Sequence, residues 1–345
     1  MTELRVPRLT FLLGIQRSGS TWLTNILDAH EDTWVFMEPF APDYGIFADF
    51  PETSLFLEES SPGIEQVLRE KMPKRLLHYK QGVAPQTISS ARWFRAQRGV
   101  LQLLLERRRL LPRTVAARLR KTELLNLNRM DADAPIVDKS VQPETWVIKE
   151  LRLAGKVKLL AKAYPEARFV ALIRHPCANV QAIDAWFRKG RLKELRRDLD
   201  GFVAKLSAQV VGQGYQRELE LCRRGGELER IALYWRVHNE ALQRSLADNP
   251  NALVLTYEEL ASAPEATARR VFAHCGLSAS ETALRYVRKS STSDVQPGSP
   301  ITTVRDSASH YRAWEKKISP ALRERALEVV NGSSLLPLFA PFYTA

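Results

Sequence analysis

Short runs of mostly apolar residues recur along the chain, and a helical pattern follows each of them. The runs cover residues 9–14, 146–149, 169–174 and 253–257, lengths that are typical of buried strands. Amphipathic patterns predict helices that begin near Ser20 and that cover residues 228–246 and 257–274, the last ended by Gly276. Strands that alternate with helices indicate an α/β fold with a parallel sheet flanked by helices.

One long stretch, about residues 43–140, departs from this alternation. It lacks strand-like runs and is predicted to be largely helical, with breaks at proline residues. We interpret it as an insertion over the mouth of the sheet. The chain of 345 residues is then a single domain, residues 1–345, that carries this helical insertion.

Composition and cysteine usage favour a cytoplasmic protein. The amino-terminal apolar stretch of about seven residues is shorter than a secretory signal requires, and no run approaches the ~20 apolar residues of a membrane span. The three cysteines, Cys177, Cys222 and Cys275, are widely spaced and odd in number, so they form neither a disulfide framework nor a metal site. We expect a reducing compartment.

The formal net charge of +12 predicts anionic partners, because a basic surface concentrates phosphate, sulfate, nucleic acid or acidic lipid. Ten Arg or Lys residues lie within 92–121, interleaved with apolar ones. This segment is either a solvated helical face or a docking surface for an anionic acceptor or membrane. The sequence indicates no particular oligomeric state.

The most informative motif follows the first apolar run. Gly14 and Gly19 stand where a P-loop has its glycines, and the turn between them leads into a helix. Such a turn directs backbone N–H groups and the positive end of the helix dipole at one point, which suits an anion. Ser20 replaces the lysine of nucleoside triphosphatases, and positive charge comes instead from Arg17. The loop is therefore predicted to hold a phosphate-like group; a plain Gly/Ser turn is the alternative.

A second motif ends the run at 169–174. Arg174-His175-Pro176 stands where a nucleoside triphosphatase has a magnesium-binding aspartate. An arginine at the carboxyl end of a strand faces the ligand crevice, and its planar fork matches phosphate geometry. We expect a second anionic group here, held without metal; a structural salt-bridged arginine is the alternative.

These residues resemble a known family, the sulfotransferases that use 3′-phosphoadenosine-5′-phosphosulfate (PAPS). Gly-Ile-Gln-Arg17-Ser-Gly-Ser-Thr-Trp22 resembles the 5′-phosphosulfate loop, and Phe-Val-Ala-Leu-Ile-Arg174-His-Pro resembles the 3′-phosphate motif. Tyr257-Glu-Glu-Leu and Tyr311-Arg-Ala-Trp314-Glu-Lys-Lys resemble two later family segments. Arg17, where the aryl branch has lysine, is closer to the carbohydrate and tyrosylprotein branches and their bacterial relatives.

The resemblance implies a P-loop NTPase-like sulfotransferase fold, PAPS as donor, adenosine 3′,5′-bisphosphate as product and no metal. It implies donor contacts from the residues that match the family motifs, which are Arg17, Ser18, Gly19, Ser20, Thr21, Trp22, Arg174, Tyr257, Arg305 and Arg312. It also implies in-line displacement at sulfur, in which donors such as Arg17 stabilise the developing charge.

Two further residues match catalytic positions of the family. Glu38, 21 residues after Arg17, matches the family base, and Lys149, 25 residues before Arg174, matches a lysine that contacts the transferring group. Independently, a carboxylate after a strand-like run and before a proline is held near the ligand edge, where apolar neighbours raise its pKa into a useful range. A surface ion pair is the alternative for Glu38, and His30 is the rival base.

The sequence departs from the family where the 3′-phosphate should bind. Ala182 replaces the usual serine and leaves Asn179 or Gln181 to bond that phosphate. Ala313 replaces a lysine, with Arg312 and Arg305 nearby.

Two other functions compete with sulfotransfer. A P-loop kinase shares the architecture but not the residues at Ser20 and Arg174, and a non-catalytic anion or nucleic-acid binding protein would suit the basic charge. The chain shows none of the aromatic, helix-turn-helix or zinc patterns of nucleic-acid binding, so no nucleic acid is expected. The expected acceptor is a small molecule, a carbohydrate or a lipid.

Overall fold

The computed structural model describes residues 7–40, 62–83, 143–292 and 306–343. Five parallel strands form one sheet in the order β2-β3-β1-β4-β5. The strands are β1 (Arg8–Leu13), β2 (Thr33–Met37), β3 (Thr145–Glu150), β4 (Arg168–Ile173) and β5 (Ala252–Thr256). The predicted parallel sheet flanked by helices is confirmed. The four predicted strands correspond to β1, β3, β4 and β5, and each begins and ends within one residue of its predicted bounds. Because every strand is parallel, all carboxyl ends meet at one edge.

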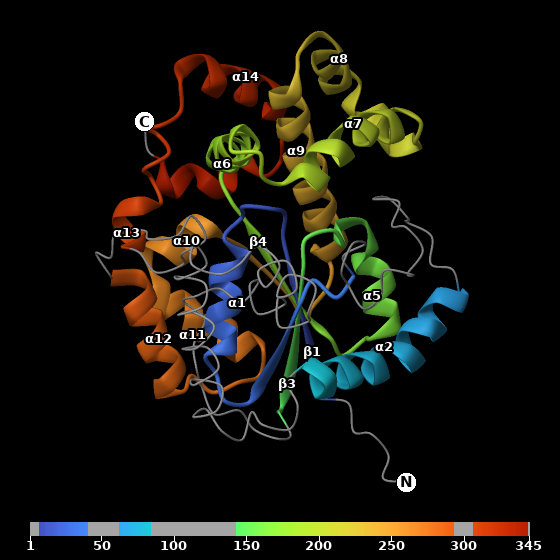
Figure 1. Cartoon of the computed structure of the whole chain (residues 1–345), viewed down its shortest axis with the longest axis vertical. Coiled ribbons are helices and arrows are strands. Elements are labelled where there is room, and N and C mark those ends of the chain that lie inside the picture. Colours follow the sequence, from blue (N-terminus) through green and yellow to red (C-terminus); the bar gives the residue numbers. More distant parts are fainter. Residues whose placement is uncertain (1–6, 41–61, 84–142, 293–305, 344–345) are drawn as a thin grey trace, which may run out of the picture.

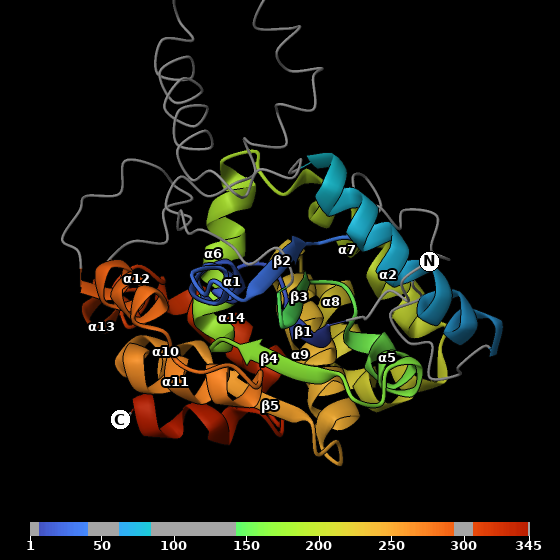
Figure 2. The same cartoon turned by 90° about the horizontal axis from the view of Figure 1, so that it is seen from below.

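Helices cover both faces of this sheet and lie beyond its carboxyl edge (Figures 1 and 2). In chain order the described α-helices are α1 (Ser20–Asp28), α2 (Pro62–Val83), α5 (Val157–Ala163), α6 (Pro176–Arg188), α7 (Lys193–Ser207), α8 (Gln216–Arg224), α9 (Glu227–Leu246), α10 (Tyr257–Ser262), α11 (Pro264–His274), α12 (Glu281–Thr292), α13 (Ser307–His310) and α14 (Pro320–Val330). The described 3-10 helices are η4 (Ala154–Lys156), η5 (Val210–Tyr215) and η6 (Leu336–Phe342). The predicted helices at 20 and at 228–246 are confirmed.

The two faces of the sheet bury alternate residues of each strand. Phe11 of β1 and Phe169 of β4 stack at 5.4 Å between ring centroids on the face covered by α5 and α9. Leu12 and Val170, their chain neighbours, lie on the opposite face under α1, α11 and α12. Since both faces are apolar, the strands appear as nearly continuous hydrophobic runs rather than as alternating ones, as expected for a parallel sheet.

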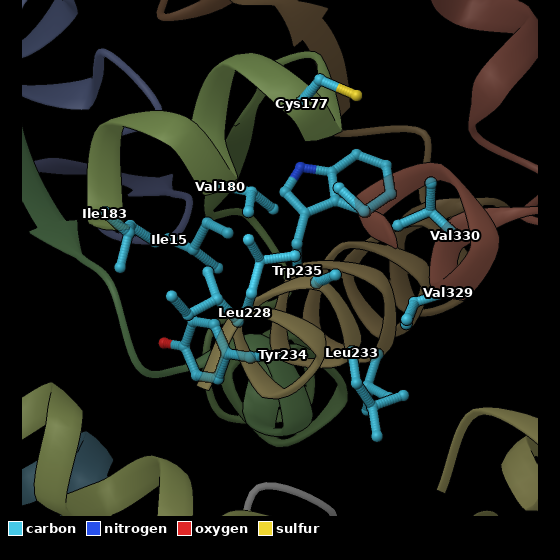
Figure 3. Close-up of a cluster of buried hydrophobic side chains, with 14 of the residues drawn as sticks. Ile15, Cys177, Val180, Ile183, Leu228, Leu233, Tyr234, Trp235, Val329 and Val330 are labelled. Carbon is cyan, nitrogen blue, oxygen red and sulfur yellow. The ribbon is translucent and has the colours of Figure 1, made fainter. Parts of the chain in front are cut away.

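A third apolar cluster lies beyond the carboxyl edge of the sheet, between α6, α9 and α14 (Figure 3). Trp235 of α9 is fully buried there, and Figure 3 shows it between Val180 of α6 and Val330 of α14. This cluster joins the helices that follow β4 to the carboxyl-terminal helices. It therefore supports the edge at which the ligand motifs end.

The described part of the insertion is α2. Its residues Leu68, Met72 and Leu76, spaced by one helical turn, are buried in the cluster that α5 and the sheet form. Pro73 lies inside this helix, so a proline does not end it here. The rest of the stretch, including the basic residues of 92–121, lies outside the described residues, and the insertion stays a prediction.

The predicted single helix over 257–274 is wrong in one detail. The structure divides it into α10 and α11, which meet at Ala263 with φ −136° and ψ 64°. Pro264, the first residue of α11, has no N–H to donate and forces the preceding residue out of the helical region. The expected stop at Gly276 is confirmed by its φ of +70°.

Cys177, Cys222 and Cys275 are all free and buried. None of the described helices is both long and apolar enough to cross a bilayer. Burial raises the pKa of the Cys177 and Cys222 thiols to about 12 and that of Cys275 to about 11.

Candidate active site

The loop between β1 and α1 combines tight turns with a helix start that no side chain caps. Arg17 has φ 66° and Gly19 has φ 94°, both in the left-handed region. Gly19 is the N-cap of α1 and offers no side-chain hydrogen bond to the first helical turn. The backbone N–H groups of such a turn are available to an anion, and the helix dipole favours negative charge there.

Both glycines of the loop are required by close contacts. A Cβ on Gly14 would lie 2.8 Å from Ser18 Oγ and 3.0 Å from the carbonyl oxygen of Leu172. A Cβ on Gly19 would lie 2.4 Å from a ring carbon of Tyr257. The loop is thus pressed against β4 on one side and against the Tyr257 ring on the other.

Arg174 connects three of the four predicted motifs. It follows the last residue of β4, and its Nη1 donates to the carbonyl oxygen of Arg17 at 3.2 Å. Its guanidinium carbon lies 4.6 Å from the centroid of the Tyr257 ring. Trp235 Nε1 donates to the Arg174 carbonyl at 2.8 Å, which anchors this residue to α9. The structure therefore brings Arg17, Arg174 and Tyr257 together, as the motifs predict.

The fourth motif reaches this site through a buried network. Trp314 stacks on His175 at 4.7 Å between centroids and donates through Nε1 to the Tyr343 hydroxyl at 3.1 Å. Tyr343 donates in turn to Glu258 Oε1 at 3.0 Å, which also accepts from the backbone N–H of His175. Burial raises the pKa of Glu258, and burial together with Arg323 and Arg174 lowers the pKa of His175 to about 3. His175 is thus neutral, and its ring packs against the carboxyl-terminal residues Trp314 and Tyr343.

Glu38 and Lys149 lie side by side at the ends of β2 and β3. The Lys149 ammonium and the Glu38 carboxylate form an ion pair, in which the Lys149 side chain is 2% exposed and the Glu38 side chain 20%. The backbone N–H of Glu38 donates to the Lys149 carbonyl at 2.8 Å, and Glu38 has φ 49°. The structure therefore brings these two predicted residues into contact. The sequence suggests apolar neighbours for Glu38, and the structure shows that the Lys149 ammonium is one of its neighbours as well.

Glu150, next to Lys149, was not identified from the sequence. Its carboxyl accepts the backbone N–H groups of Phe40 at 2.6 Å and Leu151 at 3.3 Å, and it is 1% exposed. Burial, with repulsion from Glu38, raises the pKa of Glu150 to about 8 against the opposing hydrogen bond from Phe40. It holds the chain just after Glu38 to the end of β3. The sequence feature that could have identified Glu150 is an acidic residue directly after the lysine at the end of a strand.

Trp186 of α6 was also missed. The Arg17 guanidinium carbon lies 4.2 Å from the centroid of its ring, and that of Arg191 lies 5.1 Å away. An aromatic face holds a guanidinium without competing for its hydrogen-bond donors. Trp186 therefore orients Arg17 while leaving the edge of its fork to other groups. An aromatic residue one helix away from the loop gives no local signal in the sequence.

The remaining predicted residues of the β1–α1 loop lie at or just before the start of α1, and one of them contacts Tyr257. Ser18 and Ser20 are buried, and Thr21 is half-buried at the start of α1. Trp22 is 5% exposed, donates through Nε1 to Ser290 Oγ at 3.0 Å, and meets the Tyr257 ring edge-on at 6.2 Å.

Several other candidates lie apart from the loop or have structural partners. Arg312 binds Glu315 at 2.9 Å and lies 5.7 Å from the Tyr343 ring, and Arg305 lies outside the described residues. Asn179 Nδ2 donates to the carbonyl of Gln16 at 2.9 Å, so it supports the loop from behind. His30, the rival base, accepts from Asp32 N–H at 3.1 Å and binds the Ser278 carbonyl at 2.7 Å, before the start of β2. It lies at the amino edge of the sheet, opposite the carboxyl edge.

Together these groups place buried hydrogen-bond donors at the carboxyl edge of the sheet, with the Glu38–Lys149 ion pair at the same edge. Ser18 Oγ and Arg174 Nε are buried and make no hydrogen bond with the described residues. No three His, Cys, Asp or Glu side chains in the described ranges converge as metal ligands. Buried donors without partners cost free energy and are typical of a site that a ligand completes.

Comparison with known proteins gives one family match. Residues 9–281 match the model of the protein family described as Sulfotransferase family. A search of curated protein sequences gives no match.

Some solved structures resemble the chain at low sequence identity. The sulfotransferase domain from the curacin biosynthetic pathway is 15% identical, with 94% of this chain and 97% of that one covered and a TM-score of 0.42. The sulfotransferase from Alicyclobacillus acidocaldarius is 14% identical, with 92% and 98% covered and a TM-score of 0.37. The sulfotransferase domain of the Synechococcus PCC 7002 olefin synthase is 17% identical, with 94% and 93% covered and a TM-score of 0.39. Such identities and TM-scores assign no role to any residue.

Proposed function

Because the chain belongs to the sulfotransferase family, we propose that it transfers a sulfuryl group from PAPS to a hydroxyl or amine of an acceptor. The observation that carries this proposal is the Arg174 guanidinium, which contacts both the Arg17 carbonyl and the Tyr257 ring at the carboxyl edge. It joins separate motifs into one anion-binding place. The Glu38–Lys149 pair lies at the same edge, at the ends of the neighbouring strands.

The residues present fit an anionic nucleotide donor. The uncapped start of α1 and the buried hydroxyl of Ser18 suit the 5′-phosphosulfate, which residues 17–22 would hold. Arg174, with its buried Nε, and Tyr257 would hold the 3′-phosphate end. Arg312 and Arg305 remain donor-binding candidates from the sequence, and Gln181 remains a candidate for the 3′-phosphate because the Asn179 amide donates to the carbonyl of Gln16.

Within this proposal the side chains divide the chemistry between them. When bound, PAPS supplies an activated sulfuryl group on a phosphate leaving group. Glu38 accepts the proton of the attacking hydroxyl, and the adjacent Lys149 ammonium favours the carboxylate form that can do so. Arg17 and Lys149 stabilise negative charge that develops during transfer, and no metal is required. The left-handed backbone at Glu38 aims the carboxylate from a fixed strand end.

The acceptor is proposed to be a small molecule, a carbohydrate or a lipid, and the location cytoplasmic. Three free, buried cysteines support a reducing compartment. We also propose that residues 92–121 make a peripheral contact with an anionic surface.

Calorimetric titration with adenosine 3′,5′-bisphosphate in EDTA tests the donor. We expect metal-independent binding in the micromolar range that Arg17→Ala weakens strongly and Arg188→Ala, at an exposed arginine of α6, leaves unchanged. Binding of ATP with magnesium, without binding of the bisphosphate, would contradict the proposal and support a kinase.

Turnover separates the roles of Arg17 and Glu38. Removing one preorganised donor costs about 2.7 to 4 kcal/mol of transition-state stabilisation, so Arg17→Ala should lower kcat by about two decades or more. Glu38→Gln should bind the bisphosphate like the wild type and lose turnover. The measurement is release of the bisphosphate from PAPS with a reactive acceptor; normal turnover in Glu38→Gln would exclude it as the base.

A further inference from the structure

Three neighbouring strands are each followed by a side chain with a buried hydrogen-bond donor atom that makes no hydrogen bond with the described residues. They are Ser18 Oγ after β1, Arg152 Nη1 after β3 and Arg174 Nε after β4. Ser18 and Arg174 belong to the two motifs that bind the donor in the proposed function. Arg152 belongs to neither, and no role has been given to it.

Arg152 leaves the sheet from the same strand end as Lys149, the partner of the proposed base. It follows β3 by two residues, and its side chain is partly buried. Burial raises the pKa of Tyr234, and the charges of Arg152 and Glu38 act on that pKa in opposite directions. The Tyr234 hydroxyl donates to Gln16 Oε1 of the loop at 2.8 Å. The Arg152 guanidinium is therefore within electrostatic reach of a hydroxyl that contacts the loop and that also senses Glu38.

The strand order places Arg152 on one half of this edge. The loop follows β1, Arg174 follows β4 and Tyr257 follows β5, so these donor groups occupy the β1-β4-β5 half. Glu38 follows β2, and Lys149 and Arg152 come from the end of β3, which is the other half. If Glu38 takes a proton from the acceptor, that half is where the acceptor lies.

A guanidinium is charged at every physiological pH, and a buried N–H of such a group without a partner is unfavourable. The planar fork of arginine pairs best with a carboxylate, sulfate or phosphate. We propose that Arg152 binds an anionic oxygen group of the acceptor, a carboxylate, a sulfate or a phosphate, beside the Glu38–Lys149 pair. This inference rests on the proposed function. The net charge of +12 favours the approach of such an acceptor.

Inorganic sulfate is the probe that tests the site without an identified acceptor. The full chain is first saturated with adenosine 3′,5′-bisphosphate, and sulfate is then titrated by calorimetry at constant ionic strength. The variants are Arg152→Met, which keeps an unbranched apolar stem, Arg152→Lys, which keeps the charge, and Arg188→Ala, which removes an exposed arginine of α6 and serves as the control. We expect the dissociation constant for sulfate to rise about tenfold or more in Arg152→Met, less in Arg152→Lys, and to stay unchanged in Arg188→Ala.

The other outcomes overturn the inference. Sulfate binding that survives Arg152→Met, that is absent from the wild type, or that is lost equally in Arg188→Ala would show that Arg152 has no anion site of its own. A tenfold loss of bisphosphate affinity in Arg152→Met would assign Arg152 to the donor instead. Failure of the wild type to bind the bisphosphate would overturn the proposed function itself, which distinguishes the two failures.

Thermal unfolding of Arg152→Met gives a second readout. A ligand-binding arginine without a protein partner contributes little to the fold, so we expect its Tm in the absence of ligand to equal or exceed that of the wild type. A Tm lower by several degrees, restored in Arg152→Lys, would show that Arg152 is structural.

Discussion

Left-handed backbone at non-glycine residues coincides with the proposed chemistry. Among the described residues it occurs at Arg17, Glu38 and Leu192, with φ of 66°, 49° and 53°. L-residues adopt this region at a cost of about 1 to 2 kcal/mol each. Two of the three are the loop arginine and the proposed base, which fits the tendency of strained backbone to gather at functional sites. The strain fixes where each side chain leaves the main chain.

Gly19 offers a test of this local geometry. In Gly19→Ala the left-handed φ is unfavourable and the new Cβ meets the Tyr257 ring, so we expect bisphosphate affinity to fall about tenfold or more and stability to fall by roughly 1 to 3 kcal/mol. Gly190→Ala is the matched control, because Gly190 has φ 66° and open space around it. It should lose stability alone. Calorimetry and thermal unfolding measure both effects, and unchanged affinity in Gly19→Ala would contradict the described loop.

At the scale of elements, the ends of β2 and β3 are held together by a carboxyl that titrates abnormally. Glu150, at the end of β3, accepts the N–H of Phe40 beyond β2, and its pKa is raised to about 8. An acid with a raised folded pKa keeps its proton while the unfolded chain loses it. Between the unfolded pKa near 4.5 and about 8, the folded state therefore binds more protons, and stability falls as pH rises.

Glu150→Gln removes this ionisation and keeps a carbonyl for Phe40. Its stability relative to the wild type should improve from pH 5 to pH 8, by a few kcal/mol at most, given about 1.4 kcal/mol for each pKa unit. Urea unfolding at several pH values measures this difference, with Glu166→Gln, at an exposed carboxyl, as the control. A difference that does not change with pH would show that Glu150 titrates normally.

Elements that depend on local sequence were predicted well, and those that depend on contacts were not. The strands β1, β3, β4 and β5 could be predicted from their apolar runs because buried parallel strands are hydrophobic throughout. The break between α10 and α11 was missed because the apolar pattern continues through Pro264.

At the scale of the whole molecule, most of the proposed site residues were predictable because they lie at or just after the ends of strands. Arg17, Arg174, Glu38 and Lys149 could be assigned to one edge from parallel order alone. Trp186, Glu150 and Arg152 could not be assigned to the site from the sequence, because their positions relative to it depend on residues distant in the chain. The contact of Arg312 with the Tyr343 ring likewise joins residues that are distant in the chain.

The basic charge of the whole molecule predicts a salt dependence. A protein of net charge +12 attracts an anionic nucleotide over a distance that salt screens, with a Debye length of about 10 Å at 0.1 M. We expect the association rate of the bisphosphate to fall about tenfold between low and 0.3 M salt, and that of uncharged adenosine to stay constant. Stopped-flow tryptophan fluorescence measures both. Equal behaviour of the two ligands would show that the net charge does not steer the donor.

The burial of all three cysteines has a practical consequence for experiments on this chain. Thiols with pKa values of about 11 to 12 and no solvent access react slowly with maleimides while the fold is intact. A single cysteine introduced on the surface of α7 or α14 can therefore carry a fluorophore or spin label without removal of the native three. The same reagent, applied with denaturant, makes Cys177 and Cys222 reporters of the cluster between α6, α9 and α14, and Cys275 a reporter of the cluster under α1, α11 and α12.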